Sequence, residues 1–205
     1  MNDLEYLNQI SASVNKPAKT GLLDKKMKIV LGVLGGVILL FIVLIVATAG
    51  SAPKSDEPTA ASELIRLNIR AEELNKTVNT YNTHVRSSSL RSTGSQFSSI
   101  LTEIATSSSV YLTQNLGVNP KSIAAPADDA AIITELNATL ERARLNGLLD
   151  RQYAYEMYYQ VRRLFNLEES VEKRTNDSII RAFLDSSKKS LTLIEESFQN
   201  FSGAD

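Results

Sequence analysis

An uninterrupted run of apolar residues near the N-terminus constrains this chain more than any other feature. Residues 29–49 read IVLGVLGGVILLFIVLIVATA and carry no charged side chain. As a helix, this run would be roughly 32 Å long at about 1.5 Å per residue, which matches a hydrocarbon core of about 30 Å. Apolar runs longer than about 18 residues are typical of membrane spans rather than of buried helices in soluble proteins. The run therefore predicts a transmembrane helix.

The charges that flank this run predict its orientation. Residues 1–28 contain five Lys, and three of them lie directly before the run: Lys25, Lys26 and Lys28. Only Lys54 follows the run closely. Because positively charged flanks stay in the cytoplasm, we expect residues 1–28 to be a short cytoplasmic basic leader. The rest of the chain is then expected outside the cytoplasm, anchored to the cell membrane by its single span.

Two short motifs in the run leave alternatives open. Gly32 and Gly36 form a GxxxG spacing, which can pack two membrane helices into a homo-oligomer, although Gly is also simply common in such helices. Ala47-Thr48-Ala49 is an acceptable site for signal-peptide cleavage after Ala49. The apolar region is longer than the usual 7–15 or so residues of a signal peptide, which favours an uncleaved anchor.

The remainder of the chain has the periodicity of a helical bundle. Residues 50–60 form a predicted linker that contains two Pro and no apolar period, and residues 61–205 form the predicted extracytoplasmic domain. Apolar residues then recur every three or four positions, which predicts helices over residues 60–86, 90–116, 128–146, 150–172 and 176–201. Expected N-terminal capping or first-turn residues are Ser62, Asp128 or Asp129, and Asp150.

No stretch alternates with a period of two, so no sheet is expected. The predicted fold class is therefore all-α, with one transmembrane helix followed by an antiparallel bundle of four long helices and a shorter one.

Composition excludes several kinds of chemistry. The chain has no Cys and one His, His84, so disulfides, thiolate metal sites and multi-His metal sites are impossible within it. A formal charge of −1 gives no global electrostatic reason to bind nucleic acid. P-loop, G-x-S-x-G and dinucleotide-binding motifs are absent from the sequence. We therefore predict no catalytic residue, no metal site and no cofactor.

Several short motifs resemble those of a bacterial ferritin-like family of unknown function that is usually secreted or periplasmic. They are the Leu-Gly-Val turn of residues 116–118 followed by Pro120, the Leu-Leu-Asp-Arg segment of residues 148–151 followed by Tyr153 and Met157, then Ile180 with Ala182-Phe183, and Leu191. The resemblance covers about half of the chain and implies a ferritin-like four-helix bundle outside the cytoplasm.

The resemblance does not carry the family's histidines into this chain. Family members often have His on the helix after the Tyr and near the end of the last helix, whereas residues 158–161 and 193–195 contain none here. A centre made only of carboxylates would need residues such as Glu103, Glu156 and Glu195. Acidic side chains on a solvated helix surface are the commoner interpretation, so an oxidative or metal-binding enzyme is the alternative hypothesis.

A cluster of tyrosines gives the best candidate for a binding surface. Four of the seven Tyr in the chain lie within seven residues: Tyr153, Tyr155, Tyr158 and Tyr159. At about 100° per residue, Tyr155 and Tyr159 share one helix face, while Tyr153 lies on the core stripe. The candidate partner surface is Tyr155, Tyr158 and Tyr159. Packing of the rings in grooves between helices is the structural alternative.

These features together predict a non-enzymatic, single-pass membrane protein that presents its bundle to a protein or to the cell envelope. A sensor ectodomain is a further alternative. Residues 1–28 are too short to fold into a signalling domain, so a sensor would have to signal through a partner.

Overall fold

The computed structural model describes residues 57–201 as five long α-helices and one short 3-10 helix, with no strand in this part of the chain. The helices are α3 (Glu57–Asn82), α4 (Ser88–Leu116), η1 (Pro120–Ser122), α5 (Ala127–Leu145), α6 (Leu149–Arg174) and α7 (Ser178–Gln199). The all-α prediction is confirmed for these residues, and α5 is the shorter helix that the sequence predicts.

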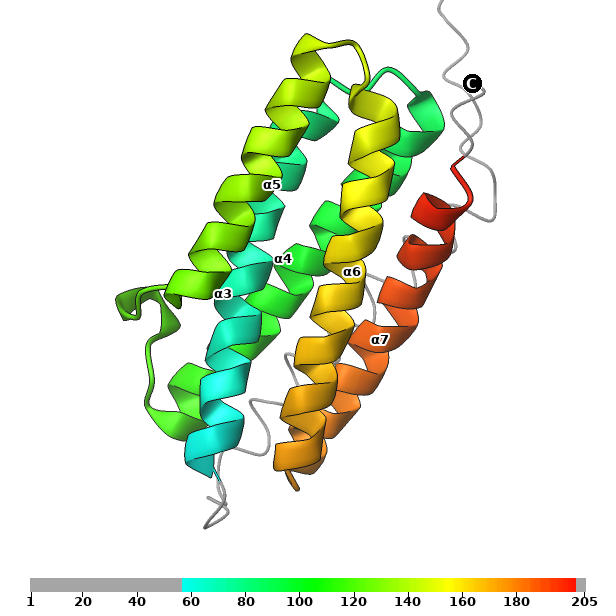
Figure 1. Ribbon diagram of the computed structural model, residues 1–205. Coiled ribbons are helices and arrows are strands. Elements are labelled where there is room, and N and C mark those ends of the chain that lie inside the picture. Colours follow the sequence, from blue (N-terminus) through cyan, green and yellow to red (C-terminus); the bar gives the residue numbers. More distant parts are fainter. Residues whose placement is uncertain (1–56, 202–205) are drawn as a thin grey trace, which may run out of the picture. The chain divides into compact units, whose positions relative to one another are not determined.

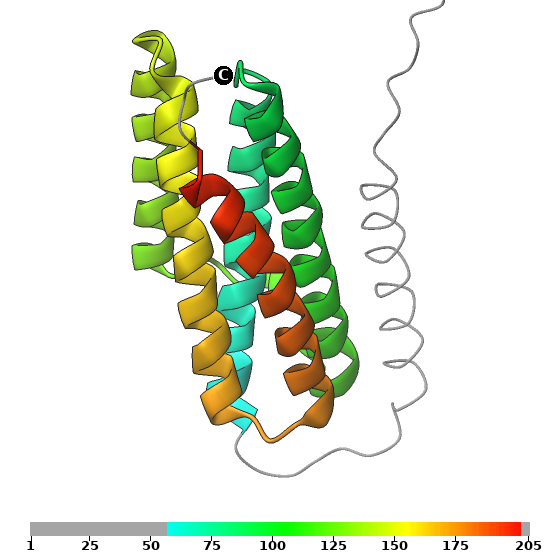
Figure 2. The ribbon, with the colours of Figure 1, turned by 90° about the vertical axis from the view of Figure 1, so that its right-hand side faces the viewer.

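Four helices form the bundle and α5 lies outside it. Helix α3 packs against α4 and α6, and α7 packs against the same two helices from the opposite corner. Figure 2 shows α7 lying between α6 and α4. Neighbours in this square run antiparallel, whereas α5 runs parallel to α3 and covers the edge between α3 and α6 (Figure 1).

The core consists of the apolar stripes that the sequence shows. All seven predicted core positions of the first helix are buried: Leu64, Leu67, Ala71, Leu74, Val78, Tyr81 and Val85. Across the bundle, Phe198 on α7 packs edge-on against Phe97, with ring centroids 5.8 Å apart, and against Tyr153 at 6.1 Å. These contacts join α4, α6 and α7. On α5, by contrast, the predicted core residues Ile132 and Ile133 are only half-buried, as befits a helix on the outside of the square.

The helix ends are defined by local capping interactions. The Ser87 hydroxyl accepts a hydrogen bond from the backbone N–H of Leu90 at the start of α4. Gly117, with φ of 64°, ends α4 in the left-handed conformation, and the N–H of Val118 donates to the Leu112 carbonyl. The Asp177 carboxylate caps α7 by accepting from Ile179 and Ile180.

Two predicted caps are wrong. Helix α3 begins at Glu57 rather than near Ser62, so it includes the last residues of the predicted linker. Pro58 fits the first turn because a helix needs no N–H there. Pro126 precedes α5 without a side-chain cap. Asp129 is buried in the first turn instead, because two arginines of α3 bind its carboxylate.

Helix α3 ends earlier than the sequence predicts, so the turn between α3 and α4 begins earlier too. Helix α3 ends at Asn82 rather than at residue 86. Asp150, in the first turn of α6, accepts hydrogen bonds from the backbone N–H groups of Arg86 (2.9 Å) and Ser87 (2.8 Å). A carboxylate that satisfies two backbone donors competes with continuation of the helix. This contact also joins the α3–α4 turn to the start of α6.

None of the helices within residues 57–201 combines the length and the apolar character that a membrane crossing requires. The predicted span 29–49, its packing residues Gly32 and Gly36 and its flanking residues Lys25, Lys26 and Lys28 lie outside the described residues.

Candidate functional site

The three tyrosines predicted as a partner surface form one aromatic patch on α6. Tyr155 and Tyr159 are one turn apart, their ring centroids lie 4.7 Å apart, and the Tyr155 hydroxyl donates to that of Tyr159 over 3.1 Å. The rings of Tyr158 and Tyr159 are 5.7 Å apart and nearly perpendicular. The structure therefore brings these side chains together. We call Tyr155, Tyr158 and Tyr159 the tyrosine patch.

The patch is both anchored and accessible. Tyr158 is half-buried and packs against the hydrophobic core, whereas Tyr155 and Tyr159 keep 55% and 44% of their surface exposed. Tyr153, two residues before the patch, is fully buried as its place on the core stripe predicts. The structural alternative, in which the rings fill grooves between helices, holds for Tyr158 but not for Tyr155 and Tyr159.

Apolar and cationic groups extend the outer face of α6. Leu148, immediately before α6 and seven positions before Tyr155, is 62% exposed. Arg162, three positions after Tyr159, forms an ion pair with Glu195 of α7 at 3.1 Å. The hydrogen bond to Glu195 raises the pKa of the Arg162 guanidinium. The hydrogen bond to Tyr159, followed by the charge of that phenol, raises the pKa of the Tyr155 phenol.

The carboxylates considered for a metal centre do not form one among residues 57–201. No group of three or more His, Asp or Glu side chains in this part of the chain could hold a metal ion. Glu156 accepts a hydrogen bond from Gln152, and Glu195 is paired with Arg162. Glu103 stands on α4, where burial raises the pKa of its carboxyl. His84 is exposed just beyond the end of α3, in keeping with a surface histidine near a helix end.

Two buried polar clusters were missed by the sequence analysis. In the first, Asp129 binds Arg66 at 3.1 Å and also binds Arg70, which is almost completely buried. In the second, the fully buried Glu168 of α6 accepts a hydrogen bond from the Ser187 hydroxyl of α7, and its other carboxylate oxygen has no partner. Arg70 and Glu168 both lie at core-facing positions of their helices. A charged residue at such a position was the feature of the sequence that could have indicated a buried polar cluster.

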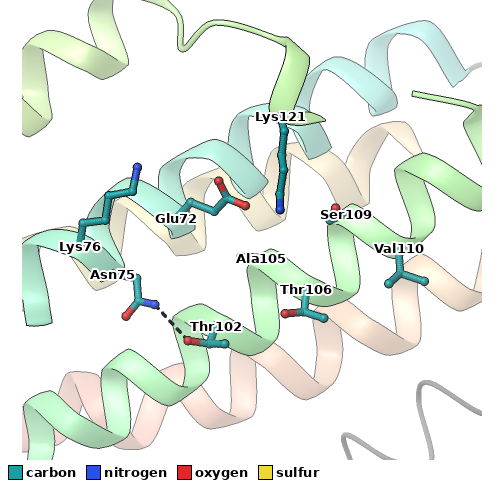
Figure 3. Close-up of a pocket in the computed structure, with 9 residues that line it drawn as sticks. All are labelled: Glu72, Asn75, Lys76, Thr102, Ala105, Thr106, Ser109, Val110 and Lys121. Atoms are coloured by element: carbon teal, nitrogen blue, oxygen red, sulfur yellow. Dashed lines mark hydrogen bonds between the residues drawn. The ribbon is translucent and has the colours of Figure 1, made fainter. Parts of the chain in front are cut away.

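A polar groove was also missed. It has a volume of about 420 Å³ and lies between α3, α4 and η1 (Figure 3). Its walls come from residues 72–76 of α3 and 102–110 of α4, and Lys121 of η1 closes one side. Because three separate segments form the groove, no local sequence motif could have indicated it.

Comparison of the chain with known protein families, curated proteins and solved structures identified no relative. No protein-family model matches the chain, and neither a curated protein nor a solved structure is significantly similar to it.

Proposed function

We propose that this chain is a single-pass membrane protein whose helical bundle lies outside the cytoplasm and makes non-catalytic contacts with a protein partner. The observation that carries the proposal is the tyrosine patch. Its two exposed rings, Tyr155 and Tyr159, contact each other, and Tyr159 also contacts Tyr158, which packs on the core. Tyr is enriched at interfaces because it offers a large contact area at a small cost in conformational entropy.

The sequence supports the membrane part of the proposal. Residues 29–49 are uncharged, and Lys25, Lys26 and Lys28 precede them. This order of charges predicts that the N-terminus lies in the cytoplasm and the bundle outside. The anchor would hold the bundle at the membrane, where an envelope protein or a second membrane protein could reach it.

The absence of cysteine makes the topology directly testable. Single cysteines would be introduced at Ser11 in the leader and at Gln96, which is exposed on α4. A membrane-impermeant maleimide applied to intact cells should label Gln96→Cys, whereas Ser11→Cys should react only after permeabilisation. The opposite labelling pattern would exclude the proposed orientation. An N-terminal epitope tag that stays on the membrane-bound chain would distinguish an uncleaved anchor from cleavage after Ala49.

The partner surface can be tested by photocrosslinking in cells. A photoreactive amino acid at position 155 or 159 should give a discrete crosslinked product, whereas the same probe at Gln96 should not, because α4 is diagonally opposite α6 in the square. Changing Tyr158 to Ser should weaken the crosslink at position 159, since the neighbouring ring supports that surface. Equal crosslinking at all three positions, or none at 155 and 159, would refute the tyrosine patch as the interface.

Self-association through the membrane helix is a separate element of the proposal. Replacing Gly32 and Gly36 by Leu should abolish any homo-oligomer that forms through the GxxxG spacing. Replacing Gly35, which is outside that spacing, is the matched control. Oligomers that persist in the double variant would show that another surface holds them together.

A further inference from the structure

The polar groove between α3, α4 and η1 presents opposite charges on facing walls. Glu72 projects from α3, and Lys121 reaches over the groove from η1 toward it (Figure 3). No ion pair joins them, and neither has an ion pair with another of the described residues. The neighbouring Lys76 is paired with Glu73 at 2.6 Å, and the charge of Glu72 also acts on Lys76. The groove therefore holds one cation, Lys121, and one anion, Glu72, that are in no direct ion pair among the described residues.

Local hydrogen bonds fix the backbone at Lys121, whose side chain is exposed. The Asn119 side chain accepts a hydrogen bond from the Lys121 backbone N–H at 3.1 Å and so caps η1. The Ser122 hydroxyl donates to the Asn119 carbonyl at 2.8 Å, and Pro120 is buried in η1, which packs against α3 and α4. The short 3-10 helix thus holds Lys121 against the bundle, although the surrounding loop is long.

The floor of the groove adds hydrogen-bonding groups. The hydroxyls of Thr106 and Ser109 line it and have no hydrogen bond within the described residues. Asn75 and Thr102 also line it, but Asn75 already donates to Thr102 over 3.0 Å, so these two groups are committed. Two hydroxyls that can donate or accept therefore line the same groove as Glu72 and Lys121.

We infer that this groove is a binding site for a small zwitterion, specifically a free α-amino acid. Its carboxylate would bind Lys121 and the Ser109 hydroxyl, and its ammonium group would bind Glu72 and the Thr106 hydroxyl. A simple anion would be repelled by Glu72 and a simple cation by Lys121, whereas a zwitterion complements both charges. The volume of about 420 Å³ lies in the lower part of the range for small-molecule sites. The inference is independent of the tyrosine patch and of the membrane anchor.

The test begins with the full chain in detergent micelles. The twenty L-amino acids are screened individually by saturation-transfer NMR, and the strongest binder is titrated by calorimetry. Its N-acetyl derivative and its methyl ester, which each lack one charge, are titrated in parallel. We expect saturable binding of the free amino acid and at least roughly ten-fold weaker binding of both derivatives, because each loses one charge-assisted hydrogen bond.

Variants connect the binding to the groove. Lys121→Gln and Glu72→Gln should each weaken binding roughly ten-fold or more, and Glu72→Gln should remove the preference for the free amino acid over its N-acetyl derivative. Lys189→Gln and Asp185→Asn change exposed charges of α7 that have no ion pair among the described residues, and they should leave binding unchanged. Circular dichroism checks that every variant is folded.

The inference is overturned if no amino acid binds saturably to the wild-type chain. It is also overturned if the N-acetyl derivative binds as well as the free amino acid, since the groove would then be an anion site. Binding that survives Lys121→Gln would place the ligand elsewhere.

Discussion

Replacing the buried Glu168 by Gln should stabilise the bundle, and the gain should increase with pH. Burial raises the pKa of this carboxyl from 4.5 to about 8, while its hydrogen bond from Ser187 and the charge of Lys188 oppose the shift. Glu172, one turn along α6, raises it further. Because the folded state holds the proton more tightly than the unfolded chain, stability falls as pH rises from about 4.5 to about 8.

The magnitude follows from the size of the shift. Each pKa unit corresponds to about 1.4 kcal/mol, so the raised pKa of Glu168 costs roughly 3 kcal/mol of stability at pH 7, where the folded state still holds the proton that the unfolded chain releases, and roughly 5 kcal/mol above pH 9, where both states are ionised. At pH 5 the carboxyl is largely protonated in the folded protein, and the cost is about 1 kcal/mol or less. A Gln side chain has a similar shape, can accept the same Ser187 hydrogen bond and never ionises.

Urea unfolding followed by circular dichroism at 222 nm, at pH 5, 7 and 9, measures the difference. The Gln variant should match the wild type within about 1 kcal/mol at pH 5 and exceed it by several kcal/mol at pH 9. Glu169→Gln is the matched control, because Glu169 is exposed on the next residue and paired with Lys173. It should not share this rise with pH. Parallel stability profiles for wild type and Glu168→Gln would mean that water reaches the carboxylate, and would refute the reasoning.

Three further substitutions test other contacts by the same unfolding measurement. Asp129→Asn should cost about 3 kcal/mol because it leaves the buried Arg70 charge uncompensated, and adding Arg70→Met should restore most of that loss; a full loss in the double variant would contradict this account. Asp150→Ala should cost about 1–3 kcal/mol by removing the acceptor for the α3–α4 turn; an unchanged midpoint would show that water replaces it. Gly94→Ala should destabilise, although Ala favours helices by about 1 kcal/mol, because its Cβ would clash with the Asn82 side-chain amide and lie 2.7 Å from the Tyr153 hydroxyl; stabilisation would show that both side chains move aside.

The sequence predicted the core better than the polar interior. Apolar stripes with steps of three and four are a direct consequence of helix geometry, so the buried face of α3 from Leu64 to Tyr81 could be predicted from spacing alone. Arg70 and Glu168 occupy the same kind of position, but their charged side chains depend on partners from α5 and α7. Such partners become visible only when the packing of the helices is known.

The two candidate sites also differ in how far the sequence alone could predict them. The face shared by Tyr155 and Tyr159 follows from local periodicity, and the structure confirms it. The groove below Lys121 depends on how η1 packs against two helices, which no single stretch of sequence encodes. The resemblance to a ferritin-like family stays a prediction, since no family model or solved structure bears on it.

The position of α5 has a consequence for how this topology tolerates change. Helices α4 and α6 run in the same direction at opposite corners of the square, so the chain must travel back along the length of the bundle between them. Helix α5 lies in this connecting segment and is roughly 28 Å long at about 1.5 Å per residue. Because only one face of α5 is buried, insertions or an engineered reporter domain on its exposed face, away from Asp129, Leu136 and Leu140, would spare the contacts that hold it to the other four helices.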